Sequence, residues 1–323
     1  MSTSPQPTLS SLTSLTSVPG VVSVELLRGA RASADTPPSL LVEVPHGADE
    51  PRHYDALRGR LRGALPEGLE LFFNVNTDLG AWTYGRLCML ELLRRFPERC
   101  AQLLRCELPR TFIDCNRVAN YGGGELKAGA LTPGIPPYVR DEHDRSLLAE
   151  LHAGYVEVAE RAYARVCGGG GLALIPHSYG PRSLGIERVD DQIVEKLRWA
   201  CAPERHDSWP LRAEVDLLTR DAKGKLYAPE GLEQRLRDSF RAAGFGVEVN
   251  GVYHLHPSTQ GYEWCARYPG QVLTLELRRD LLVEAWTPFE PMHVVSSKCE
   301  RVAQILAGAL ALAAPESPSP RSC

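Results

Sequence analysis

The sequence lacks the features that mark several large classes of protein. Its 323 residues contain no apolar run near the ~20 residues that a transmembrane helix needs. The formal charge of -4 provides no basic surface for nucleic acid or anionic lipid. The glycine-rich runs lack the Gly-Lys-Ser/Thr ending of a phosphate loop, and no serine sits in a G-x-S-x-G frame. These absences leave small polar molecules as the best-fitting partners, with no nucleic acid and no membrane.

Cysteine spacing and the two ends of the chain bear on location and domain organisation. Nine cysteines without C-x-x-C spacing indicate reduced thiols rather than a disulfide frame or a zinc ribbon. The N-terminus has no basic segment followed by an apolar one, so we expect a cytoplasmic protein. Ser/Thr/Pro-rich segments at 1–18 and 314–323 predict disordered tails. The remaining residues, 19–313, are expected to form one domain.

Predicted strands alternate with predicted helices along this domain. Runs of branched and aromatic residues predict strands at 39–46, 69–78, 110–117, 172–178 and 271–282, and a helix followed by a strand within 228–250. Helical spacing of apolar residues predicts helices at 80–98, 141–167 and 296–314. The alternation indicates an α/β fold, a single three-layer α/β/α domain whose mostly parallel sheet is covered on both faces. Ligands of such sheets bind beyond the carboxyl ends of the strands.

Three of the predicted strands end in side chains that could bind a metal: His46, Asp78 and His177. Imidazole and carboxylate are ordinary zinc ligands, and a catalytic zinc commonly takes three protein groups and a water. Asp49 is an alternative acid, because a loop or a first helical turn can bring residues three apart to one ion. A single histidine at a strand end is more often a hydrogen-bonded surface residue, and the hypothesis therefore rests on the equivalent positions.

The segment RTFIDCNR, residues 110–117, concentrates charged and amide groups. Alternation along a strand would place Arg110, Asp114 and Asn116 on one face. Guanidinium groups bind carboxylates in a bidentate manner, which indicates a site for an acidic small molecule. The alternative is a structural Arg–Asp pair at a strand end.

Glu276 lies inside an otherwise leucine-rich predicted strand, LTLELRRDLL. A carboxylate in this setting is either held as a base with a raised pKa or paired with an arginine. Arg278 and Arg279 are the available partners for the second interpretation.

Five motifs in this order resemble the N-formylglutamate amidohydrolase family: VPHGADEP, NTDLGAWTYGRL, RTFIDCNR, PHSYGPR and LELRRDLL. The resemblance covers most of 19–313 and implies that this range is a catalytic domain. It also implies a fold similar to that of the zinc carboxypeptidases and aspartoacylases, with a twisted mixed sheet between helices.

The resemblance assigns a role to each candidate for metal binding and base catalysis. His46 and His177 would hold one zinc ion together with one acid. Carboxypeptidase-like sites place that acid three residues after the first histidine, which is Asp49 here, whereas the TDLGA motif of the formylglutamate hydrolases points to Asp78. Glu276 matches the general base.

The same resemblance implies how the substrate is bound. Asn116 and Arg117 match the pair that grips a substrate carboxylate, Arg110 matches the residue that polarises the scissile carbonyl, and Arg182 of PHSYGPR is a further substrate-binding candidate. The implied activity is hydrolysis of the amide bond of a small N-acylated, formyl-like acidic amino acid by zinc-activated water. No motif matches in 198–231, which could shape a different pocket.

Two other functions remain compatible with the sequence. One is a peptide-tailoring or peptide-cleaving hydrolase with the same mechanism and a wider cleft; the other is a non-catalytic sensor of an acidic metabolite.

The family typically reads Asp-x-His-Ser where this chain has Ile175-Pro176-His177-Ser178. A partner that orients His177 is therefore missing or comes from elsewhere. The sequence does not determine the oligomeric state.

Overall fold

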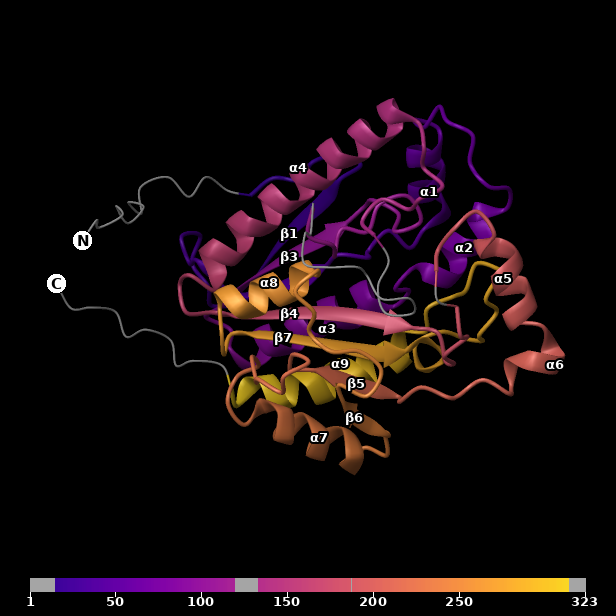
Figure 1. Ribbon diagram of the computed structural model, residues 1–323. Helices are drawn as coiled ribbons and strands as arrows, with labels where there is room; N and C mark the ends of the chain where they lie inside the picture. Colours follow the sequence, from indigo (N-terminus) through magenta and orange to yellow (C-terminus); the bar gives the residue numbers. More distant parts are fainter. Residues whose placement is uncertain (1–14, 120–132, 187, 314–323) are drawn as a thin grey trace.

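The computed structural model describes residues 15–119, 133–186 and 188–313, so most of the two predicted tails, 1–14 and 314–323, lies outside the described residues. The described strands form a seven-stranded sheet in the order β1-β3-β2-β4-β7-β5-β6 (Figure 1). Their bounds are β1 (Val22–Arg28), β2 (Pro38–Val44), β3 (Cys100–Cys106), β4 (Leu172–Tyr179), β5 (Val215–Leu218), β6 (Val247–Val249) and β7 (Val272–Arg278). The strands β3, β2, β4 and β7 pair in parallel, whereas β1 and β5 pair antiparallel with β3 and β7. The predicted mostly parallel, mixed sheet is confirmed.

Helices cover both faces of the sheet (Figure 1). On one face, α3 (Ala81–Arg95) packs on β2, β3 and β4, and is joined by α9 (Ser296–Ala311) and α7 (Leu232–Ala242). On the other face, α4 (Glu142–Val166) packs on β2, β3 and β4, and α8 (Gln260–Arg267) packs on β7. This arrangement is the predicted three-layer α/β/α domain. Shorter helices lie in the connections: α1 (Pro51–Arg58), α2 (Leu69–Asn76), α5 (Ile193–Ala200), α6 (Pro203–His206) and the 3-10 helix η1 (Arg279–Leu281).

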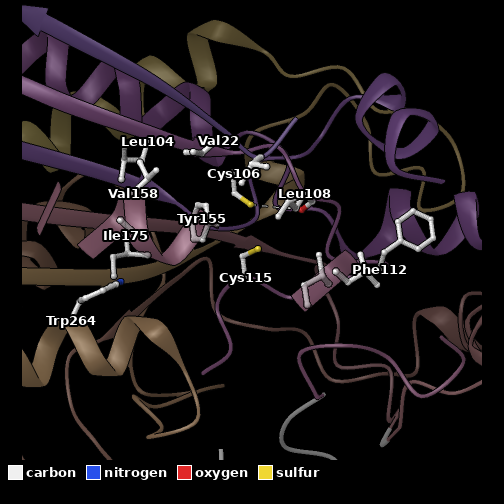
Figure 2. Packing of buried hydrophobic residues seen from close by; sticks show 14 of the residues in the cluster. Val22, Leu104, Cys106, Leu108, Phe112, Cys115, Tyr155, Val158, Ile175 and Trp264 are labelled. Atoms are coloured by element: carbon white, nitrogen blue, oxygen red, sulfur yellow. Dashed lines mark hydrogen bonds between the residues drawn. The ribbon is translucent and has the colours of Figure 1, made fainter. Parts of the chain in front are cut away.

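Alternating residues of the central strands divide between two apolar cores. In β2, Leu41 belongs to the core under α4, and Leu40 and Val42 belong to the core under α3 and α9. Figure 2 shows part of the α4 core, where Tyr155 and Val158 lie near the strands that carry Leu104 and Ile175. No helix in the three described segments is long and apolar enough to cross a membrane.

The predicted strand at 69–78 is wrong, because this segment forms helix α2. Branched and aromatic content favoured a strand, but the buried residues are Leu69, Phe72 and Phe73. This i, i+3, i+4 spacing buries one face of a helix. Asp78 therefore follows a helix, not a strand.

The predicted strand at 110–117 is also wrong, since these residues form successive turns after β3. The chain turns where Phe112 N and Ile113 N donate to Pro109 O, and again where Arg117 N donates to Asp114 O. The true strand, β3, escaped the sequence pattern because it contains two polar residues. Gln102 is satisfied by Glu25 O of β1, and Arg105 reaches Gly47 O beyond β2. The other predicted strands and helices are confirmed, with ends shifted by a few residues.

Close packing of α3 on the sheet makes a prediction about Gly85. A Cβ atom at this buried position would lie 3.0 Å from Pro176 Cγ and 3.2 Å from Val42 Cγ1. Gly85→Val should therefore lower the free energy of unfolding by about 1–3 kcal/mol through overpacking. Urea denaturation measures the change.

The matched control is Gly154→Ala in α4, where nothing lies within 4 Å of an added Cβ. It should raise the free energy of unfolding by up to ~1 kcal/mol, since alanine favours a helix more than glycine does. Unchanged or greater stability of Gly85→Val would contradict the inferred tight packing of α3 on β2 and β4.

Candidate active site

Three segments bring His46, Asp78 and His177 together at the carboxyl edge of the sheet. His46 lies two residues beyond β2, His177 lies inside the neighbouring strand β4, and Asp78 lies in the connection between α2 and α3. Asp78 Oδ2 is 3.2 Å from His46 Nδ1 and 2.7 Å from His177 Nδ1. All three side chains are buried. Burial alone would raise the pKa of Asp78, but the two imidazoles lower it well below its usual value.

Asp114 orients His46 from the other side of its ring. Its Oδ1 is 2.7 Å from His46 Nε2 and also accepts a hydrogen bond of 2.9 Å from Asn116 N. Its Oδ2 accepts from Arg110 Nε at 3.0 Å, and Arg117 Nη2 is 3.7 Å away. Burial would raise the pKa of Asp114, but Arg117, Arg110 and His46 together hold it far below its usual range. Because Nε2 of His46 is engaged, Nδ1 is directed toward Asp78.

Asp49, the alternative acid, lies apart from this group. Arg105 of β3 binds both Asp49 Oδ1 and Glu50 Oε1, and Glu50 is the N-cap residue of α1. His53 completes a small cluster there, with its Nδ1 accepting from Glu50 N. The acid that lies beside the two histidines is therefore Asp78.

Glu276 faces the same region from β7. The parallel register pairs it with His177 of β4, and the antiparallel register pairs it with Asp216 of β5. Its Oε2 atom is buried and accepts no hydrogen bond from any described residue. Burial raises the pKa of Glu276 to about 7. A carboxyl group of this kind can take up and release a proton near neutral pH.

Neither arginine that follows Glu276 forms an ion pair with it. Arg278 binds Glu214 and Asp280 instead. Arg279 is buried, lies 5.4 Å from the Trp286 ring centroid, and donates to Val75 O at 2.8 Å and Ser178 O at 3.1 Å. Arg279 thus ties the segments that carry Asp78, His177 and Glu276 to one another. Its spacing three residues after Glu276 is visible in the sequence, but its carbonyl partners are not.

A cavity of about 560 Å³ is lined by His46, Asp78, His177, Glu276 and Arg279. The predicted substrate-binding residues Arg110, Asn116, Arg117 and Arg182 also line it. Asn116 Oδ1 accepts from Gly261 N, and Arg182 donates to Trp209 O at 2.7 Å and pairs with Asp207. Arginines outnumber carboxylates in the described part of the lining. The carboxylates are Asp78, Asp114 and Glu276, and the arginines are Arg110, Arg117, Arg182, Arg188, Arg212 and Arg279. This balance favours an anionic ligand.

The donor set at His46, Asp78 and His177 fits a divalent metal ion. Two ring nitrogens and a carboxylate oxygen lie within 4.8 Å of one another, which is a common ligand set of catalytic zinc. The contact between Asp114 and His46 supplies the outer carboxylate that metal-binding histidines usually have. An acid that could orient His177 was expected at position 175, but this position is Ile175, whose side chain is buried in the α4 core. The unpartnered oxygen of Glu276 leaves an acceptor for a water molecule nearby.

Comparison with known proteins supports the fold. No family model and no curated protein matches the chain. An N-formylglutamate amidohydrolase from Ralstonia eutropha aligns with 18% identity and a TM-score of 0.52, covering 91% of this chain and 98% of that one. A gene product of Agrobacterium tumefaciens aligns with 18% identity and a TM-score of 0.51, covering 90% and 95%. The predicted resemblance to the N-formylglutamate amidohydrolases is therefore confirmed at the level of the fold.

Proposed function

We propose that this protein is a zinc-dependent amidohydrolase that cleaves the amide bond of a small N-acylated acidic amino acid, as in N-formylglutamate. One observation carries the proposal: Glu276 is partly buried, its buried Oε2 atom has no hydrogen-bond donor among the described residues, and it lies beside His177 in register and shares a cavity with His46 and Asp78. The solved amidohydrolase with the same fold supports the reaction class.

In this mechanism His46, Asp78 and His177 would hold the zinc ion, which when bound polarises water and the scissile carbonyl. Glu276 accepts the proton of the attacking water and then delivers it to the leaving amine. Arg110 lines the cavity with its guanidinium fixed by Asp114, and it donates to the oxygen on which negative charge develops.

Asn116 and Arg117 bind the carboxylate of the substrate beside this centre, and Arg182 contributes further positive charge. A cavity of about 560 Å³ suits a small molecule, which favours this substrate class over an extended peptide. A sensor would have no use for a buried carboxylate oxygen without a hydrogen-bond donor, whose burial is unfavourable when the group is ionised. We place the activity in the cytoplasm, as the cysteine spacing indicates, with residues 19–313 as the catalytic domain.

Metal analysis tests the ligand set. The protein purified without added zinc should contain near-stoichiometric zinc, and the His46→Ala/His177→Ala double variant should lose most of it, because two of three protein ligands are gone. Asp78→Asn should also weaken zinc binding, whereas Asp49→Asn should not. The matched control is His254→Ala, a histidine of the same cavity outside the donor group. Unchanged zinc in the double variant would refute the metal site.

Kinetics test the role of Glu276. Glu276→Gln preserves the shape of the side chain but cannot accept a proton, so hydrolysis of N-formyl-L-glutamate should fall by roughly 10²–10⁴. Zinc content should stay near that of the wild type. Steady-state rates and metal analysis on the same preparations measure both quantities. Wild-type turnover by a folded Glu276→Gln variant would remove this residue from the mechanism.

The raised pKa of Glu276 makes a separate prediction about stability in metal-free protein. The carboxyl group has its usual pKa of 4.5 in the unfolded chain and a pKa of about 7 in the folded one. Between these values the folded state binds more protons, so stability falls as pH rises through this window, by about 3 kcal/mol in total. Glu276→Gln removes the loss and should stabilise the protein at pH 8 but not at pH 4. Denaturant unfolding at both pH values measures the difference, and equal effects at both would contradict a raised pKa of Glu276 in the folded protein.

A further inference from the structure

Arg212 lies in the segment 198–231, to which the sequence motifs assign no role. It lines the same cavity as Glu276 and the metal-binding group, and its side chain is partly exposed. Arg212 Nε donates to Ser183 Oγ at 3.2 Å, and Nη1 donates to Gly180 O at 3.4 Å. Its guanidinium carbon lies 5.0 Å from the centroid of the Tyr179 ring and 5.8 Å from that of Tyr253. The side chain is thus held in place by neutral groups.

No carboxylate among the described residues pairs with Arg212, unlike Arg110 and Arg182 of the same cavity. No described carboxylate lies within 4.0 Å of it, whereas Arg110 pairs with Asp114 and Arg182 pairs with Asp207. A half-buried guanidinium without a counterion is expected to attract an anion from solution. The cavity therefore offers Arg212 as a cationic position distinct from the one at Asn116 and Arg117.

The backbone around Arg212 is also fixed. Arg212 N donates to Pro181 O at 2.9 Å, and Arg278 Nη1 donates to Arg212 O at 3.3 Å. A binding group held on both sides of its backbone and along its side chain loses little freedom when the ligand binds. Arg212 is therefore pre-organised rather than a mobile surface residue.

The position of Arg212 relates it to the reacting groups. Arg212 and Arg110 both interact electrostatically with Glu276. Tyr253, whose ring lies near Arg212, in turn interacts electrostatically with Arg110 and Arg117. Arg117 and Arg212 also line the same cavity, so one small molecule bound there can contact both.

We propose that Arg212 is a specificity-determining residue that binds a second carboxylate, on the side chain of the substrate, while Arg117 binds the first. Arg212 would thus be the residue that selects, within the proposed substrate class, for the acidic side chain over its neutral amide. A carboxylate is favoured over a phosphate, because the cavity also contains Asp78, Asp114 and Glu276, which would repel a doubly charged group more strongly. This inference rests on the proposed function for the identity of the reaction, but not for the binding of a dicarboxylate.

Calorimetric titration of the protein as purified tests the binding. The probes are glutarate and its monoamide glutaramate, which match in size and differ by one carboxylate. Wild-type protein should bind glutarate about tenfold or more tightly than glutaramate, the effect of one charge-assisted hydrogen-bonded pair. Arg212→Gln should abolish this preference and leave glutaramate binding unchanged. Arg212→Lys keeps the charge and should keep part of the preference, which separates loss of charge from misfolding.

The control variant is Arg94→Gln in α3, which removes an exposed arginine outside the cavity lining and should retain the wild-type preference. Equal binding of the two probes by the wild type, no binding of either probe, or a preference that survives in Arg212→Gln would each overturn the proposal.

Turnover of N-formyl-L-glutamate and N-formyl-L-glutamine distinguishes failure of this inference from failure of the proposed function. If neither amide is hydrolysed but the glutarate preference depends on Arg212, the amidohydrolase function fails and the dicarboxylate site stands. If both are hydrolysed and Arg212→Gln lowers kcat/KM equally for the two, Arg212 acts on Glu276 rather than on the substrate, and the inference fails. The expected result is a selective fall, about tenfold or more, for N-formyl-L-glutamate.

Discussion

The parallel pairing of β2, β4 and β7 is the constraint on which the site depends. Parallel strands end at the same edge of a sheet, and residues in register lie side by side. The pairing of His177 with Glu276 places an imidazole and a carboxyl group on neighbouring strands, and β2 delivers His46 to the same edge. Tight contact of α3 with Pro176 and Val42 holds two of these strands against one helix. The chemistry of the site is thus a consequence of strand order and register.

Carboxylates with buried oxygen atoms are satisfied in different ways in this domain, and the contrast singles out Glu276. Glu43 accepts from the hydroxyls of Tyr155 and Tyr163 at 2.7 and 2.8 Å. Asp216, the register partner of Glu276 in β5, accepts from Gly251 N and Val252 N at 2.9 and 2.8 Å. Asp114 is surrounded by Arg110, Arg117 and His46. Among these acids Glu276 alone has a buried oxygen without a donor, and an unsatisfied group of this kind in a cavity is typical of a functional position.

The arginines around the cavity perform several distinct tasks. Arg279 binds carbonyl oxygens and fixes the segments that carry Asp78, His177 and Glu276, whereas Arg110 is held by Asp114. Arg182 is paired with Asp207, and Arg212 has no such partner among the described residues. Arg212 differs from the buried Arg279 in being partly exposed, so under the proposed function a second anionic group on the ligand would gain a partner that a neutral analogue cannot use.

The sequence by itself determined the α/β class, the strands β2, β4, β6 and β7, and several site candidates. Buried parallel strands read as branched apolar runs, and His46, His177 and Glu276 interrupt or follow such runs. It also predicted Asp78 as one of two acids, but only the tertiary structure placed Asp78 beside the histidines and Asp49 beside Arg105. Helix α2, the turns at 110–117 and the strands β1, β3 and β5 went unrecognised, since tertiary contacts override local composition there. The position of Arg212 near Glu276 likewise depends on how β5 pairs with β7, a contact between residues far apart in the chain that no local pattern encodes.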